Sequence, residues 1–181
     1  PIQNILFYKK NLPEQNVLNW APSVMFRYMF NKQHVLMFRY RGRSSTPNIE
    51  DLQEVIDITD PMNMRYGNPN LKPSFNNSFT LDYRKFVPEA MRSYSANLYY
   101  TNTLNSVANK MTYDPETGAR VYKKENVNGN WQARGYFSFN TPLKNKKFTI
   151  SSNTNARYSD AVSYTSVGNN RNLDQELSTT H

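Results

Sequence analysis

The sequence predicts an all-β fold, an antiparallel up-and-down meander of about six strands. Three observations support this prediction. Apolar and polar residues alternate with period two over several segments, which is the pattern of a sheet with two unlike faces. Short turns alternate with long links between these segments. Finally, only 38% of the 181 residues are apolar, yet 14% are aromatic, so the chain is polar without the composition of a disordered protein.

The first two strands are expected at 20–30 and 34–43, joined by a short turn near Lys32. Residues 5–8 are compatible with a further short strand. One face of the first pair is apolar, with Val24, Phe26, Tyr28, Phe30, Leu36, Phe38 and Tyr40. The other face carries Arg27, Arg39 and Arg41 beside several methionines. Arginines are costly in a soluble core but cost little against a water-filled lumen.

The third strand is expected at 76–86 and the fourth at 92–113, with a short turn near Glu89 between them. In the third strand Phe79, Leu81 and Tyr83 oppose Asp82 and Arg84. The fifth and sixth strands are expected at 119–140 and 146–158, around a short turn near Leu143. They contribute Trp131, Phe137 and Tyr158 to the apolar face, and Arg134 and Arg157 to the polar face. Beyond Ser159 the sequence predicts a loop.

Two long links, 44–75 and 101–130, separate these strands. Residues 49–58 of the first link have spacing compatible with a short helix. In the second link, a turn at 114–118 predicts a hairpin arm that projects beyond the sheet. Short turns on one side and long loops on the other are typical of outer-membrane barrels, whose long loops face outside.

Composition is also compatible with a transmembrane β-barrel. The mean hydropathy of −0.80 is far too low for a helical membrane protein. In a barrel only every second residue meets lipid, and aromatic girdles mark the two interfaces. Trp20 and Trp131 each precede a short turn by about one membrane-strand length of roughly 9–11 residues, so both are expected at the outer interface. About six strands cannot close a membrane barrel, because the smallest has about eight.

A proline-rich loop at 60–73 organises the rest of the chain, because its prolines and its glycine fix the backbone that enters the third strand. Its segment Gly67-Asn68-Pro69-Asn70-Leu71-Lys72-Pro73 resembles the GNPxLKPE signature of TonB-dependent outer-membrane receptors. The closest resemblance is to the Bacteroidetes-type outer membrane protein beta-barrel family. The flanks 41–53, 113–118 and 125–131 are also similar to that family. Ser74 departs from the glutamate that is common there.

The resemblance covers roughly residues 16–158 and implies part of a 22-stranded nutrient transporter in the outer membrane. It implies as partners the outer-membrane lipid, a plug domain of the same protein, the TonB system and an unknown nutrient. Glycan, siderophore, peptide and cobalamin substrates stay open. Because the chain starts at Pro1 and ends at His181, we expect a piece of a longer protein, without the plug, the early strands and the terminal strand.

Candidate functional residues fall into three groups. The signature residues are interpreted as structural, shaping the loop and aiming the next strand: Gly67, Asn68, Pro69, Leu71, Lys72 and Pro73. Candidate extracellular ligand contacts are Asn63, Arg65 and Tyr66. Candidate lumen-facing residues, which could bind water and one another, contact a plug or set permeant selectivity, are Arg27, Arg39, Arg41, Asp82, Arg84, Arg134 and Arg157.

No catalytic constellation is found, so no enzyme activity and no cofactor are expected. The two histidines, His34 and His181, lie far apart in sequence, and the carboxylates near residues 57–60 and 114–116 lack the spacing of a calcium loop. The chain contains no Cys, which excludes disulfides and thiolate metal sites. The net charge of +8 is spread along the chain, whereas nucleic-acid binding requires a basic face on a known module.

A soluble or surface-anchored β-rich binding module, glycan-binding or adhesin-like, is the alternative. An enzyme with unrecognised residues is a third. The direction of Phe79, Leu81, Tyr83 and Phe137 discriminates between the first two. A contiguous apolar belt with a polar reverse side favours a barrel, whereas two apolar faces packed on each other favour a sandwich.

Overall fold

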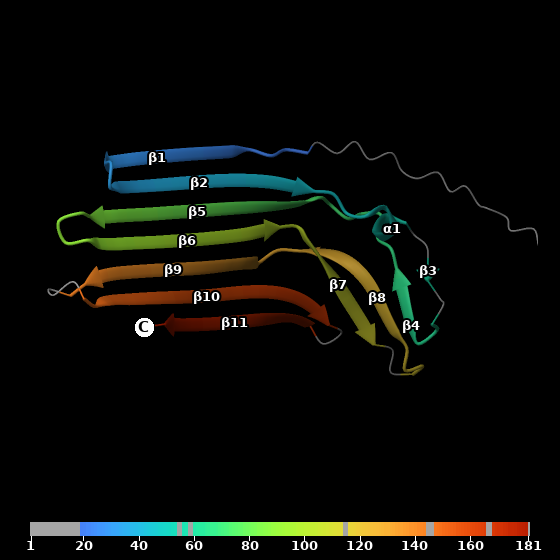
Figure 1. Ribbon diagram of the computed structural model, residues 1–181. Coiled ribbons are helices and arrows are strands. Elements are labelled where there is room, and N and C mark those ends of the chain that lie inside the picture. Colours follow the sequence, from blue (N-terminus) through green and yellow to red (C-terminus); the bar gives the residue numbers. More distant parts are fainter. Residues whose placement is uncertain are drawn as a thin grey trace, which may run out of the picture.

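The computed structural model describes residues 19–53, 56–57, 60–113, 116–143, 147–165 and 168–180 (Figure 1). Seven long strands form one antiparallel up-and-down meander, in which each strand pairs with the next long strand in the chain. They are β1 (Ser23–Asn31), β2 (His34–Ser45), β5 (Ser74–Val87), β6 (Arg92–Leu104), β9 (Asn130–Pro142), β10 (Thr149–Thr165) and β11 (Gly168–Thr180). The prediction of an all-β antiparallel meander is confirmed.

The two long links carry the remaining elements. The first contains α1 (Ile49–Leu52), β3 (Ile56–Asp57) and β4 (Asn63–Tyr66), and the second contains β7 (Ser106–Tyr113) and β8 (Arg120–Val127). β7 and β8 form a hairpin arm beyond the end of the sheet, and β4 pairs in parallel with β8 (Figure 1). Both long links therefore meet at one end of the sheet, while the short turns near Lys32, Glu89 and Leu143 lie at the other.

The sequence misplaced several strand boundaries. The expected strand 92–113 is divided into β6 and β7 at Asn105, whose φ is +50°. The expected strand 119–140 is divided into β8 and β9 beside Gly129, whose φ is +107°. These two positive φ angles turn the arm out of the sheet. The prediction of a loop beyond Ser159 is wrong, because β10 continues to Thr165 and β11 returns beside it.

Some expectations fall outside the described residues. These are the short strand at 5–8, residues 114–115 of the arm's turn, residue 146 at the start of the sixth strand, and His181. The helix predicted within 49–58 is the single turn α1. Among the described residues, no helix combines the length and apolar character needed to cross a membrane.

One face of the meander is apolar, because the register keeps the apolar residues of neighbouring strands opposite one another. Phe26 lies opposite Phe38, Phe38 opposite Leu81, and Leu81 opposite Leu98. This face is exposed: Leu98 keeps 57% of its accessible surface. In the part of the chain that the structure describes, no second sheet covers this face, so it lacks the packing of a β-sandwich.

Aromatic rings form two rows across the apolar face. Near the long links the row runs over five strands, with ring-centroid separations of 5.0 Å (Tyr40–Phe79), 6.0 Å (Phe79–Tyr100), 5.9 Å (Tyr100–Trp131) and 4.9 Å (Trp131–Tyr158). Near the short turns lie Tyr28, Phe30, His34, Tyr83, Tyr94 and Phe139. Such paired rows are the girdles that flank the lipid-facing band of a membrane barrel.

The spacing of the two rows fits a bilayer. Trp131 and Phe139 are eight residues apart on β9, which is about 27 Å at about 3.4 Å per residue. A strand tilt of about 35–45° reduces this to about 20 Å of thickness, close to the roughly 25 Å band of outer-membrane barrels. Trp20 lies at the same end as Trp131, because its carbonyl accepts a hydrogen bond from the Ser44 amide (3.2 Å).

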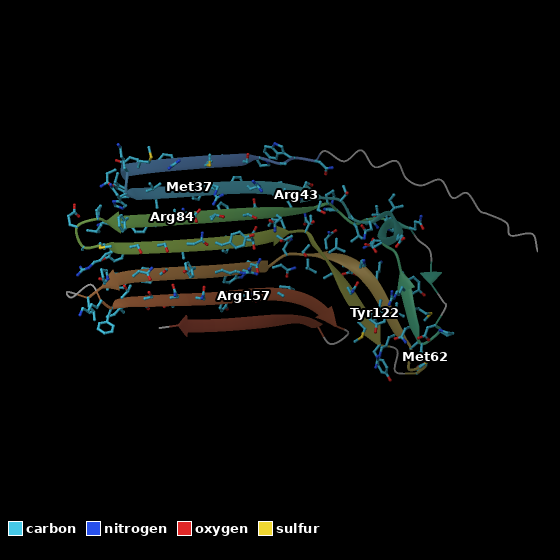
Figure 2. All side chains as sticks on the ribbon, viewed as in Figure 1. Met37, Arg43, Met62, Arg84, Tyr122 and Arg157 are labelled. Atoms are coloured by element: carbon cyan, nitrogen blue, oxygen red, sulfur yellow. The ribbon has the colours of Figure 1, made fainter. Side chains whose placement is uncertain are left out.

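The reverse face of the meander carries polar residues that include Arg84 and Arg157, both of which are labelled among all the side chains drawn in Figure 2. Buried apolar side chains lie elsewhere. Among the described residues they are Leu71, Ala119 and Val127, which keep 3%, 5% and 1% of their surface. All three belong to the two long links. Among the described residues, the apolar core therefore lies where the two long links meet. The sheet itself is a single layer and has no apolar core of its own.

Candidate functional site

The loop 60–73 begins with a turn built by Asp60. Its carboxylate accepts hydrogen bonds from the Met62 amide (3.0 Å) and the Asn63 side-chain amide (2.7 Å), and its carbonyl accepts one from the Asn63 amide (3.0 Å). The Asn63 side chain, followed by the Met62 amide, holds the pKa of the Asp60 carboxyl below its usual value, because both donors favour the ionised form. This turn directs β4 along β8.

Asn68 organises the centre of the signature segment. Its backbone amide donates to the Asp51 carbonyl (2.6 Å), and its side-chain amide donates to the Lys124 carbonyl (2.8 Å). Its side-chain oxygen accepts from the Asn70 amide (3.0 Å), which forms an Asx-type turn ahead of Leu71. A single asparagine thus connects the helix end, the loop and the hairpin arm.

Gly67 lies where no side chain can fit. A Cβ atom built on it would lie 1.7 Å from the carbonyl oxygen of Gln53, at the end of α1. The contact atom is backbone, so it cannot move aside as a flexible side chain would. Leu71 lies nearby with only 3% of its surface exposed. Close backbone approach explains why the signature segment has glycine here.

Asn126 on β8 closes the loop against the arm. Its side-chain oxygen accepts from the Lys72 amide (2.8 Å), and its side-chain nitrogen donates to the Lys72 carbonyl (3.0 Å) and to the Asn105 carbonyl (2.8 Å). The Lys124 ammonium adds an ion pair with Asp51 at 2.6 Å. We call the joined unit of 60–73 and 106–127 the loop cap.

The three candidate ligand contacts occupy different positions in the loop cap. The Asn63 side chain is engaged by Asp60 and therefore serves the turn. Arg65 is exposed on β4, between its register partners Asp57 on β3 and Tyr122 on β8. Tyr66 is half-buried at the end of β4. Asn63 and Arg65 are both exposed to solvent, whereas Tyr66 is partly covered.

All seven candidate lumen-facing residues lie on the polar face of the sheet, but they do not form one cluster. Arg39 pairs with Asp82 at 2.7 Å, and Asn97 donates to the other Asp82 oxygen (2.6 Å). Arg27 and Arg84 line a hollow of about 650 Å³ near the short turns. Arg41 and Arg39 line a smaller hollow of about 360 Å³ near the long links.

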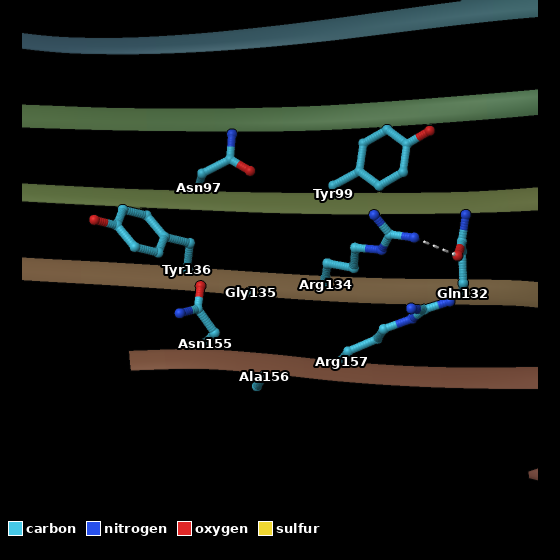
Figure 3. A pocket seen from close by; sticks show the side chains of 9 residues that line it. All are labelled: Asn97, Tyr99, Gln132, Arg134, Gly135, Tyr136, Asn155, Ala156 and Arg157. Atoms are coloured by element: carbon cyan, nitrogen blue, oxygen red, sulfur yellow. Dashed lines mark hydrogen bonds between the residues drawn. The ribbon is translucent and has the colours of Figure 1, made fainter. Parts of the chain in front are cut away.

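Arg134 and Arg157 line the largest of these hollows, about 690 Å³ on the polar face of β6, β9 and β10 (Figure 3). The other polar lining residues are Asn97, Tyr99, Gln132, Tyr136 and Asn155. Alternation in the sequence assigns Tyr99, Gln132 and Tyr136 to this face, but it gives no register between strands. Which of these residues lie beside the two arginines depends on that register, so the sequence did not predict the hollow.

His34 lies in the short-turn aromatic row, stacked on Phe30 at 4.1 Å and against the edge of Tyr83 at 5.1 Å. Across the residues that the structure describes, no three His, Asp or Glu side chains gather as a metal site.

A family model described as "Outer membrane protein beta-barrel family" matches residues 4–180. No curated protein matches the sequence. The matched region extends over the whole meander and both long links, so it includes the loop cap, the aromatic rows and the polar hollow.

Proposed function

The chain belongs to the outer membrane protein beta-barrel family, and from this premise we propose that it forms part of the barrel wall of a TonB-dependent nutrient transporter. Outer-membrane localisation follows from the family. The observation that carries the proposal is the pair of aromatic rows on one face of a single-layer sheet whose other face is polar. A wall of this kind separates lipid from a water-filled interior.

The signature loop supports the specific transporter class. The segment 67–73 resembles the receptor signature, and its contacts with Gln53, Lys124 and Asn126 make it a fixed part of the loop cap. The described sheet is open, since β1 and β11 do not pair with each other in the described residues. In this proposal further strands close the barrel, and a plug domain of the same protein fills it and contacts TonB.

The glycan-binding or adhesin-like alternative has less support. A soluble sandwich would cover Leu81, Leu98 and Phe137 with a second sheet, and these side chains lie on an uncovered face in the described structure. The proposed protein has no enzyme activity and binds no cofactor or nucleic acid. The proposal specifies the substrate only as a nutrient whose uptake requires energy.

Uptake measurements test the proposal. Cells that express the intact parent protein should accumulate a nutrient that cells without it do not, and deletion of tonB or a protonophore should abolish the difference. The protein should also be recovered in the outer-membrane fraction, with gel migration that changes on boiling. Uptake that is equally fast without TonB would identify a passive porin and overturn the transporter proposal.

A further inference from the structure

Two arginines face each other on the polar side of the sheet. Arg134 on β9 is the register partner of Arg157 on β10, and its other register partner is Tyr99 on β6. Like charges directly opposite on neighbouring strands destabilise a sheet. Sheet stability alone therefore does not explain this arrangement, and because both side chains are exposed, water or a ligand can solvate the two charges.

Among the side chains that the structure describes, no carboxylate pairs with Arg134. Asp82 on β5 already accepts from Arg39 and Asn97. Glu176 on β11 is the register partner of Arg157, on the side away from Arg134. The contact of Arg134 is with a neutral group, the Gln132 side-chain oxygen at 3.3 Å. The three register partners Glu176, Arg157 and Arg134 thus contain two guanidinium groups and one carboxylate.

The hollow around the arginines contains the groups that recognise a polar ring. Figure 3 shows the side chains of Arg134 and Arg157 extending toward the Gln132 end, with Tyr99 beside Arg134 and Tyr136 at the opposite end of the hollow. Tyrosine rings offer apolar faces with a polar tip, and carboxamides both donate and accept. A volume of about 690 Å³ is within the roughly 300–1,000 Å³ range of small-ligand sites.

We propose that this hollow binds an anionic sugar, with its carboxylate held by Arg134 and Arg157. Guanidinium groups bind carboxylates through paired, charge-assisted hydrogen bonds. The ring of the sugar lies against Tyr99 or Tyr136, and its hydroxyl groups bond to Asn97, Gln132 and Asn155. This inference rests on one part of the proposed function, namely that the polar face lines the barrel interior.

Equilibrium titration of the intact protein, purified from outer membranes in detergent, tests this site without requiring energised uptake. The probes are glucuronate and the matched neutral sugar glucose. Glucuronate should bind at least ten-fold more tightly than glucose. Arg134→Gln should weaken glucuronate binding at least ten-fold with glucose binding unchanged, and Arg134→Lys should have a smaller effect because it keeps the charge but loses the paired geometry.

The control is Arg27→Gln, which removes another exposed arginine of the same face outside the hollow. It should change glucuronate binding less than two-fold. Equal binding of both sugars, no binding of either, or equal losses in Arg27→Gln and Arg134→Gln would overturn the site. If Arg134→Gln and Arg157→Gln instead lower the unfolding temperature of a protein that does not bind glucuronate, a carboxylate of the protein itself occupies the arginines, and the proposal fails. Uptake that proves independent of TonB would leave these titrations unaffected.

Discussion

The side chain of Asn126 binds the backbone of Lys72 in both directions, accepting from its amide at 2.8 Å and donating to its carbonyl at 3.0 Å. This is the hydrogen-bond pattern that a neighbouring strand would supply. Residue 72 lies just before β5 and residue 126 just before β9, so one carboxamide couples the entries of two spanning strands. The loop cap is thereby joined to the sheet that carries it.

Asn126→Ala should loosen this junction. The change removes three hydrogen bonds made by the Asn126 side chain. It should lower the stability of the loop cap by about 1–3 kcal/mol, because hydrogen bonds to water partly compensate for the lost ones. Amide hydrogen exchange at residues 68 and 70–72 should accelerate, residues 69 and 73 being prolines without an amide hydrogen. The matched control is Asn109→Ala, an exposed asparagine on β7 of the same arm. Equal protection of residues 68 and 70–72 in both variants would contradict the role of Asn126.

Gly67→Ala should disturb the signature loop. The added Cβ would lie 1.7 Å from the Gln53 carbonyl oxygen, so the backbone of α1 or the loop must move. Overpacking of this kind costs about 1–3 kcal/mol. The yield of heat-modifiable folded protein should fall. Gly135→Ala is the control, since its Cβ would meet Leu98 Cδ2 at an ordinary 3.5 Å. Full recovery of Gly67→Ala would refute the steric argument.

A charge introduced on the apolar face should oppose membrane insertion. Ala156 and Asn155 are adjacent, exposed residues of β10 on opposite faces. Ala156→Arg should destabilise the inserted protein by about 2–4 kcal/mol, because a charge at mid-bilayer depth is poorly solvated by lipid. Asn155→Arg should insert normally. Urea titration of protein refolded into lipid vesicles measures the difference. The reverse order would show that the two faces have been assigned the wrong way round.

The Asp60 turn should depend on pH. The carboxyl pKa is lowered in the folded loop, first by the Asn63 side chain and then by the Met62 amide. The Asp60 carboxylate is therefore protonated more readily in the unfolded loop. At neutral pH the ionised carboxylate stabilises the folded loop. It should be lost only as the pH falls through the lowered folded pKa. Amide shifts of residues 62 and 63 should report this step, and Asp60→Asn should remove it.

The faces of the sheet could be predicted from sequence, whereas the loop cap could not. Alternation placed Phe79 and Leu81 on one face of the strand and Asp82 and Arg84 on the other, because a strand has a fixed period of two. The bend at Asn105 depends on one backbone angle, and the Asn126–Lys72 contact joins residues 54 positions apart. Neither leaves a periodic signal. β11 was missed because its sequence, GNNRNLDQELSTT, lacks the apolar alternation that identified the other strands.

The hollow on the polar face was also beyond sequence reasoning, for a related reason. Arg134 and Arg157 were identified as members of one face, but their direct opposition depends on the register of β9 and β10. A shift of the register by two residues would keep both on the same face and place Arg134 opposite a different residue of β10. Pattern therefore predicts which face a residue occupies, whereas its neighbours on that face require the structure.

The parallel pairing of β4 with β8 has a consequence for biogenesis. Residues 63–66 and 120–123 belong to different links, and they can meet only after both links have been translocated to the same side of the membrane. Once they have paired, retraction of either link would require breaking this ladder, the Lys124–Asp51 ion pair and the Asn126 hydrogen bonds together. We therefore expect this contact to stabilise the inserted position of β5, β6 and β9 once it has formed.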